Sequence, residues 1–144
     1  MKIVVLGGSP NKKGSTHILA DCFRQGAEEA GHAVEMIDIA HADIHPCIGC
    51  IHCGYEGPCV QKDDVEIIRK KILDADMLVF ATPLYYYGMS AQLKKNDRPV
   101  LCLQQLHPEE TYEVGITCCG MEQRQLDLRC AGGSLQDVGA VFEF

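Results

Sequence analysis

Apolar and polar positions alternate in blocks along the first two-thirds of the chain. Residues 3–6 form a continuous aliphatic run, which is typical of a strand buried on both faces. A glycine-rich loop follows. Beyond Ser15 or Thr16, the predicted N-cap, apolar residues recur at helical spacing as far as Gly31, which is placed to end the helix in a left-handed conformation. Residues 34–39 then predict a second strand.

The same order continues after a cysteine-rich segment. Asp63 and Glu66 fit a capping box at the start of a helix, and residues 77–82 predict a third buried strand that Pro83 ends. The helix between them has an apolar stripe made of Val65, Ile68, Ile72 and Ala75. The first two-thirds of the chain therefore read as strands joined through helices.

The last third of the chain predicts further elements of the same kinds. A helix is expected to begin within residues 90–95 and to be interrupted by Pro99. Strands four and five are expected over residues 113–117 and 139–144, with a short helix within 121–129. Because parallel strands need right-handed crossovers, the whole pattern predicts an α/β fold doubly wound around a five-stranded parallel sheet of order 2-1-3-4-5.

Length and composition indicate a single domain over residues 1–144. Thirteen Lys and Arg against 20 Asp and Glu give a formal net charge of −7, which repels phosphate backbones and anionic lipids. We therefore expect no nucleic-acid partner and no membrane partner. The apolar runs are too short to cross a bilayer, and the first residues do not resemble a secretory leader, so the expected location is the cytoplasm.

The loop of residues 7–16 has neither the G-x-G-x-x-G pattern nor the Walker A pattern. It opens a helix at the carboxyl end of the first strand, where backbone N–H groups and the helix dipole attract a phosphate. The hydroxyls of Ser9, Ser15 and Thr16 add donors, so the loop predicts a site for the terminal phosphate of a mononucleotide bound without Mg²⁺. The alternative is a tight glycine turn followed by an ordinary helix cap.

Three consecutive tyrosines, residues 85–87, follow the third strand. In a sheet of the predicted order, the carboxyl ends of strands one and three flank the crevice where ligands bind. The phosphate loop and this aromatic turn would then face each other, which suits a planar ligand with a phosphate tail. The alternative is that the tyrosines pack an interface or cover the sheet.

Four of the nine cysteines fall within a short stretch and have the pattern C-x2-C-x2-C-x5-C. These residues are Cys47, Cys50, Cys53 and Cys59. Three thiolates at x2 spacing suit a four-iron cluster, and Cys59 can complete the same cluster. Three alternatives remain open: a structural zinc site, a thiol–disulfide switch between Cys50 and Cys53, and thiols that bind nothing.

The loop of residues 8–16, the turn of residues 82–94 and Lys62-Asp63-Asp64 together resemble the NADPH-dependent FMN reductase group of flavodoxin-like proteins. Within that group, the cysteine pattern resembles the iron–sulfur flavoproteins. The resemblance covers about residues 1–95 and implies a flavodoxin-like fold, bound FMN and oxidoreductase chemistry. Because the flavin performs the chemistry, no catalytic side chain is expected.

The resemblance also implies roles for individual residues. The phosphate of FMN would be surrounded by Ser9, Asn11, Ser15 and Thr16. The ribityl chain and isoalloxazine would be lined by Pro83, Leu84, Tyr85, Tyr86 and Gly88. Residues 117–120, after strand four, would form a third wall. The resemblance further implies that the cluster approaches a flavin across subunits, so a homodimer or homotetramer is expected.

The sequence thus predicts one flavodoxin-like FMN-binding domain with a cysteine-rich insertion at about residues 45–61, named here the cysteine segment. The expected function is an FMN-dependent oxidoreductase that passes electrons between a reduced donor and an acceptor, using a 4Fe–4S cluster and a small-molecule or ferredoxin-type partner. One alternative is an NAD(P)H-dependent FMN or quinone reductase without a cluster. Another is a non-catalytic electron carrier or thiol redox sensor.

Overall fold

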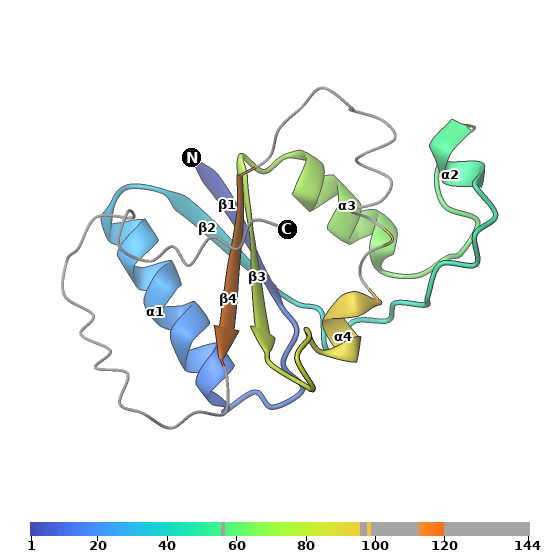
Figure 1. The fold of residues 1–144 in the computed structure, drawn as a ribbon. Helices are drawn as coiled ribbons and strands as arrows, with labels where there is room; N and C mark the ends of the chain where they lie inside the picture. The colour runs from blue at the N-terminus through green and yellow to red at the C-terminus, as the bar shows by residue number, and fades with distance from the viewer. Residues whose placement is uncertain (56, 96–97, 99–112, 120–144) are drawn as a thin grey trace.

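In the computed structural model, four parallel strands form one sheet within the residues that the structure describes, which are 1–55, 57–95, 98 and 113–119. In the order in which they lie in the sheet, the strands are β2 (Ala33–Asp38), β1 (Lys2–Gly7), β3 (Met77–Pro83) and β4 (Glu113–Cys119). β1 has parallel neighbours on both sides, and Ile3 lies opposite Val34 of β2 and Met77 of β3. Figure 1 shows this sheet at the centre of the molecule.

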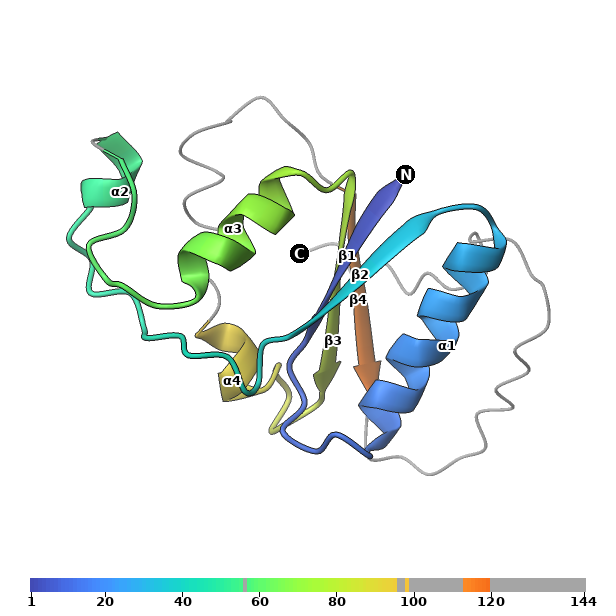
Figure 2. The same cartoon turned by 180° about the vertical axis from the view of Figure 1, so that it is seen from behind.

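Helices cover both faces of the sheet, as Figure 1 and Figure 2 show from opposite sides. α1 (Ser15–Glu29) lies on one face, and α3 (Val65–Leu73) and α4 (Ala91–Lys94) lie on the other. The four-residue helix α2 (His52–Tyr55) stands apart from the sheet, beyond α3 and toward the end of the molecule where β1 and β3 begin. Crossovers on both faces make the fold doubly wound.

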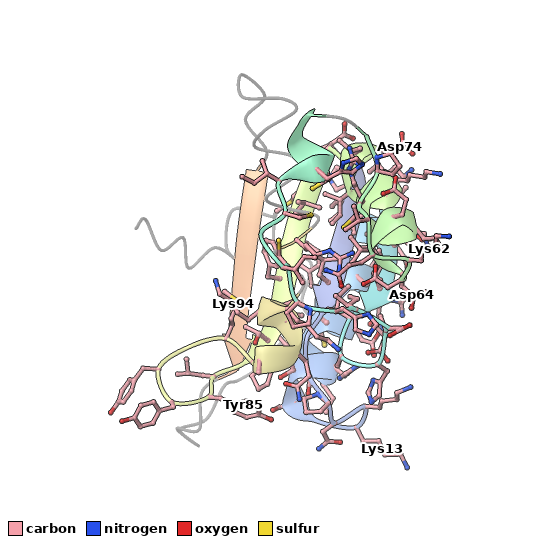
Figure 3. All side chains as sticks on the ribbon, turned by 90° about the vertical axis from the view of Figure 1, so that its right-hand side faces the viewer. Lys13, Lys62, Asp64, Asp74, Tyr85 and Lys94 are labelled. Carbon is pink, nitrogen blue, oxygen red and sulfur yellow. The ribbon has the colours of Figure 1, made fainter. Side chains whose placement is uncertain are left out.

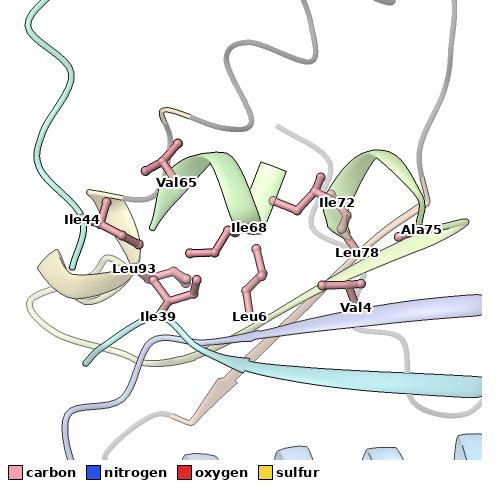
Figure 4. Close-up of a cluster of buried hydrophobic side chains, with 10 residues drawn as sticks. All are labelled: Val4, Leu6, Ile39, Ile44, Val65, Ile68, Ile72, Ala75, Leu78 and Leu93. Atoms are coloured by element: carbon pink, nitrogen blue, oxygen red, sulfur yellow. The ribbon is translucent and has the colours of Figure 1, made fainter. Parts of the chain in front are cut away.

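β1 is buried on both faces because its side chains alternate between two apolar clusters. Val4 and Leu6 pack on the α3 side and Ile3 and Val5 on the α1 side, and all four are fully buried. Figure 4 shows the cluster under α3, whose other members are Ile39, Ile44, Val65, Ile68, Ile72, Ala75, Leu78 and Leu93. The continuous aliphatic run of the first strand is thereby explained.

The structure confirms the predicted elements among the described residues, with small shifts at their ends. β2 begins and ends one residue earlier than expected, and β3 includes Pro83. The four stripe positions predicted for α3 are all buried. Gly31 follows α1 with a φ of 85°, as its placement predicted. α4 begins within the expected range.

The predicted N-cap of the first helix is wrong. Ser15 and Thr16 are already the first two residues of α1, and Gly14 is the N-cap. The reason is a turn in which the Gly14 N–H donates to the Asn11 carbonyl at 3.0 Å, which brings the chain into the helix before either hydroxyl residue. Both hydroxyl residues therefore belong to the first helical turn.

The predicted capping box at Asp63 and Glu66 is also wrong. α3 begins at Val65, and its N-cap is Asp64, which makes no side-chain capping bond. The carboxylate of Asp63 accepts from the Val65 N–H at 3.3 Å and also from the guanidinium of Arg98, which makes two bonds to it. A tertiary ion pair is thus added to one local bond at the start of the helix.

The observed strand order agrees with the first four positions of the predicted 2-1-3-4-5 sheet, and β4 spans the predicted fourth strand. The predicted fifth strand at residues 139–144, the helix within 121–129 and the interruption at Pro99 all lie outside the described residues. Among the helices that the structure describes, none combines the length and apolar character needed to cross a membrane.

Candidate functional site

The loop after β1 is shaped by its own polar groups. Ser9 is buried, and its hydroxyl donates to the Asn11 carbonyl and accepts from the Asn11 N–H, both at 3.3 Å. The Asn11 side chain in turn accepts from the N–H of Lys13 at 3.1 Å. Two of the predicted phosphate-site residues, Ser9 and Asn11, therefore fix the path of the chain into α1.

The N-terminus of α1 is not neutralised by its own helix. The N-cap Gly14 offers no capping side chain, and the first turn contains no acidic residue. Exposed Ser15 and buried Thr16 are the first residues of that turn. The positive end of the helix dipole, with hydroxyls beside it, is a favourable place for an anion.

Ser90 joins this loop to the chain that leaves β3. Its hydroxyl donates to the Gly8 carbonyl at 2.6 Å and accepts from the Leu93 N–H at 3.2 Å, which caps α4. Its own N–H donates to the hydroxyl of Thr82 at 3.0 Å. Ser90 is fully buried, so one hydroxyl holds the phosphate loop and the start of α4 together.

Gly8 makes this close approach possible. A Cβ built on Gly8 would lie 2.6 Å from the Leu93 Cβ and 3.0 Å from the Ser90 hydroxyl oxygen. Real Cβ atoms do not approach other heavy atoms that closely, so a glycine is required where the loop packs on α4. Gly8, the second glycine of the loop after β1, therefore has a packing role.

The tyrosines form a tight turn beyond the end of β3. Tyr85 and Gly88 exchange two backbone hydrogen bonds of 2.9 and 3.0 Å, and between them Tyr86 and Tyr87 have φ values of 46° and 63°. Two left-handed central residues define a type I′ turn, which favours Asn and Gly rather than tyrosine. The turn therefore holds a backbone conformation that its side chains do not favour.

This turn presents an exposed aromatic surface. Tyr86 and Tyr87 are 97% and 93% exposed, and their ring centroids lie 5.8 Å apart with an edge-to-face orientation. Leu84 and Tyr85 are also exposed, whereas Pro83 and Gly88 are half-buried. Figure 3 places Tyr85 and Lys13 at the same end of the molecule, so the turn and the phosphate loop share the carboxyl end of the sheet.

The structure thus brings the predicted site residues to one end of the sheet. Residues 117–119, part of the predicted third wall, form the end of β4 next to β3, with Cys119 in register with Pro83. Gly120 lies outside the described residues. The arrangement offers an anion site and an apolar aromatic turn on two neighbouring loops, which is the chemistry that a planar molecule with a phosphate requires.

The cysteine segment lies away from this end. Cys47 and Cys50 are exposed, Cys53 and Cys59 are half-buried, and none of the four forms a disulfide. Four soft thiolates suit an iron–sulfur cluster or zinc by number and chemistry. Among the residues that the structure describes, however, no three metal-binding side chains are gathered around one point. The donor set fits a cluster, and the segment must close around it to bind it.

The two ends of the cysteine segment are held together by hydrogen bonds. The Gln61 side-chain amide donates to the Pro46 carbonyl at 3.0 Å. The Asp64 N–H donates to the Asp43 carbonyl at 2.9 Å, and the Asp43 N–H donates to the Asp64 carboxylate at 2.8 Å. The His45 N–H donates to the carboxylate of Asp63 at 3.0 Å. The segment therefore leaves and returns to the body at one place.

The carboxylate of Asp63, which accepts the His45 N–H, also forms a buried ion pair with Arg98. Both side chains are almost completely inaccessible to solvent. Burial alone would raise the pKa of Asp63, but bonds from Arg98 and from the N–H groups of His45 and Val65 lower it below the ordinary value. Burial alone would likewise lower the pKa of Arg98, and its pairing with Asp63 outweighs this and raises it.

The structural roles of Ser90 and Arg98 could not be inferred from the sequence. Ser90 precedes Ala91 as an ordinary helix cap would, and nothing local indicates its bond to Gly8. Arg98 and Asp63 pair across 35 residues of sequence, so no motif spacing reveals them. Arg98 and Asp63 both lie in polar stretches of the sequence, so no local signal marks either of them for burial.

We predict that Gly8→Ala destabilises the fold. The added methyl group would overlap Leu93 and Ser90, and overpacking of this kind costs about 1–3 kcal/mol in the free energy of unfolding. Urea unfolding of the purified variant measures this change. Gly26→Ala in α1 is the matched control, because nothing lies within 4 Å of its added Cβ, and it should raise stability by about 0.5–1 kcal/mol. Equal effects of the two substitutions would contradict the packing role of Gly8.

We also predict that Asp63→Asn destabilises the fold most at neutral pH. Removing one partner of a buried ion pair costs about 3–5 kcal/mol. Because the folded-state pKa of Asp63 is lowered, its contribution is complete above about pH 4, the ordinary aspartate value, and is lost as the pH falls through the folded value. The difference in unfolding free energy between wild type and variant should therefore shrink below pH 4. Asp21 on α1 is exposed, so the unfolding free energy of Asp21→Asn should stay close to that of wild type at every pH.

Comparisons with known proteins agree with this geometry. A family model described as NADPH-dependent FMN reductase matches residues 1–96. An iron-sulfur flavoprotein of Methanocaldococcus jannaschii is 40% identical over 94 residues, covering 65% of this chain and 49% of that protein. An iron-sulfur flavoprotein of Archaeoglobus fulgidus is 35% identical over 94 residues, covering 65% of this chain and 43% of that protein. The chain spans about half the length of the curated relatives it matches.

A solved structure shows the same fold. The NAD(P)H:quinone oxidoreductase from Methanothermobacter marburgensis matches with a TM-score of 0.63 at 18% identity, covering 87% of each chain. This likeness supports a flavodoxin-like α/β fold, and the family match rests on the two-thirds of the chain that carry both loops and the cysteines. The chain therefore belongs to the NADPH-dependent FMN reductase family.

Proposed function

We propose that this protein binds FMN at the carboxyl end of the sheet and acts as an FMN-dependent oxidoreductase. The observation that carries the proposal is the Ser90–Gly8 bond, which holds the loop at the α1 N-terminus beside the chain that leads from the tyrosine turn. A ligand that needs a phosphate site and an aromatic surface together finds both on these two loops. The family match supports FMN as that ligand.

Individual residues have distinct tasks in this proposal. The FMN phosphate lies at the α1 N-terminus, with Ser15 and Thr16 as hydroxyl donors and with Ser9 and Asn11 shaping the loop. The ribityl chain and ring are lined by residues of the turn, namely Pro83, Leu84, Tyr85, Tyr86 and Gly88. When bound, FMN supplies one- and two-electron chemistry. The chain contributes the anchoring of the phosphate, the orientation of the ring and an apolar surface that excludes water from one of its faces.

We further propose that the cysteine segment holds a 4Fe–4S cluster through Cys47, Cys50, Cys53 and Cys59. The thiolate chemistry of the four cysteines, their spacing and the names of the two iron-sulfur flavoprotein relatives support this assignment. A cluster of this kind supplies one-electron chemistry, which matches a flavin that accepts electrons singly. Thiolates persist best in a reducing compartment, so we place the protein in the cytoplasm.

The position of α2 supports a functional oligomer. α2 carries Cys53 and lies toward the end of the molecule where the strands begin, whereas the tyrosine turn lies at the opposite end. A cluster held there would exchange electrons more readily with a flavin of another copy than with its own. We therefore propose a homodimer or homotetramer built from single domains of residues 1–144 around a five-stranded 2-1-3-4-5 sheet, with a small-molecule or ferredoxin-type redox partner.

One observation favours a second candidate function. Among the described residues, no three His, Cys, Asp or Glu side chains are grouped closely enough to hold a metal ion. This arrangement fits an NAD(P)H-dependent FMN or quinone reductase that carries no cluster. In that case NAD(P)H would reduce the flavin directly and the thiols would take no part. The two candidates share the same FMN site and differ in whether iron accompanies the flavin.

The FMN site is tested with the double variant Ser15→Ala, Thr16→Ala. A hydrogen bond to a charged group contributes about 1.5–3 kcal/mol, so the dissociation constant of FMN should rise about tenfold or more. Fluorescence titration of the flavin-free protein measures the dissociation constant. Asp21→Ala, farther along the same helix, is the control and should leave it unchanged. Wild-type affinity in the double variant would refute the phosphate assignment.

The cluster is tested by measuring iron and acid-labile sulfide per bound FMN in protein purified without oxygen. We expect about four of each per FMN. Cys53→Ser should lower both values while FMN remains bound, whereas Cys22→Ser on α1 should lower neither. FMN without iron or sulfide, together with direct oxidation of NADPH, would identify the cluster-free reductase instead.

A further inference from the structure

The base of the cysteine segment is the strongest feature that the proposed FMN site does not use. Residues 45–61 leave the body and return to it beside Asp63, whose carboxylate accepts the N–H of His45 at 3.0 Å and of Val65 at 3.3 Å. His45 begins the segment, and Val65 lies shortly after its end. One buried carboxylate therefore holds together the two stretches of chain that lead into and out of the four cysteines.

Arg98 completes this arrangement from a third part of the chain. Its Nη1 and Nη2 atoms donate to the two carboxylate oxygens of Asp63, each at 2.8 Å, and Nη1 also donates to the His45 carbonyl at 2.7 Å. Arg98 is only 2% exposed. A planar fork that bonds both oxygens of a carboxylate fixes orientation as well as charge, which a lysine ammonium cannot reproduce.

The structure assigns to Arg98 the role of a positioning residue for the cysteine segment. It holds both ends of the segment on the face of the sheet that α3 and α4 cover, so that the four thiols can close around one metal centre. This inference rests on the proposed cluster in the segment, and it adds a residue that lies outside the cysteine motif and does not itself bind metal.

The charge of Arg98 also acts on the segment. The negative charges of Cys59 and Cys47 both contribute, after burial and the Asp63 pairing, to the raised pKa of Arg98. The guanidinium therefore places a positive charge near the part of the chain that carries these two cysteines. A positive charge near a cluster also favours the added electron, so its removal should lower the cluster's reduction potential.

A nearby contact ties the chain just before the cysteine segment to the end of α4. Lys95 donates to the Ala42 carbonyl at 3.5 Å, just before the segment begins, and α4 immediately precedes Lys95. α4 is itself anchored to the phosphate loop through Ser90 and Gly8. The segment is thus held to the same short helix that carries one side of the proposed FMN site.

The experiment compares wild type with Arg98→Ala and Arg98→Lys in the full chain purified without oxygen. Three quantities are measured: the rate at which EDTA removes iron, the cluster's midpoint potential, and hydrogen exchange of peptides covering residues 43–65. Arg24→Ala on α1 is the matched control, because Arg24 forms an ion pair with Glu28 at 3.1 Å on the other face of the sheet.

We expect both Arg98 variants to lose iron about 10- to 100-fold faster than wild type, as found when partners outside a metal's ligand set are removed. Hydrogen exchange near residues 45 and 63 should quicken more than exchange in β1, while FMN content stays at the wild-type value. Arg98→Ala should shift the midpoint potential to a more negative value. Arg98→Lys should restore the potential, because it keeps the charge, without restoring resistance to EDTA. The Arg24 control should change none of these quantities.

Other outcomes overturn the inference. Unchanged iron loss and unchanged exchange in both variants would show that Arg98 does not position the segment. Loss of FMN together with exchange that quickens equally in β1 and in residues 43–65 would show a general structural role instead. If wild-type protein holds FMN but no iron, the cluster itself is refuted. Exchange of residues 43–65 then decides alone: faster exchange in the Arg98 variants upholds the positioning of the segment, and unchanged exchange overturns it.

Discussion

The parallel pairing of β1 with both β2 and β3 is the constraint on which the rest of this structure depends. Because a strand with two parallel neighbours must be reached by crossovers, the chain runs over one face of the sheet through α1 and over the other through α3. The same pairing aligns the carboxyl ends of β1 and β3. The loops that leave these ends therefore meet, and the Ser90 hydroxyl needs only to fasten them together.

The parts of this fold that were predictable from the sequence are those governed by local periodicity. The aliphatic run of β1, the buried stripe of α3 and the left-handed Gly31 each follow from the residues themselves, and the structure confirms them. The helix starts were not predictable, because they depend on contacts outside the local pattern. Asp63 accepts the Val65 N–H as a capping residue would, but the N-cap is Asp64, and a guanidinium 35 residues away also binds the Asp63 carboxylate.

The candidate site shows the same division. The composition of both loops was visible in the sequence, and the fold places them at one end of the sheet. Their conformations were not visible, since Tyr86 and Tyr87 occupy left-handed positions for which the sequence offers neither Asn nor Gly. Ser9 was predicted as a donor to a ligand, and its bonds within its own loop were not visible in the sequence. Residue type thus indicated where the site lies, while the contacts that shape it are tertiary.

Because the two ends of the cysteine segment are bonded to each other, the length of the segment does not determine the geometry of the sheet. Asp43 with Asp64 and Pro46 with Gln61 close the segment at its base, so residues added or removed between Cys47 and Cys59 need not move β2 or α3. A loop of different length and sequence joined at this base would leave the pairing of the strands unchanged. A foreign metal-binding loop grafted between Pro46 and Gln61 would inherit both an anchored base and a buried positive charge beneath it.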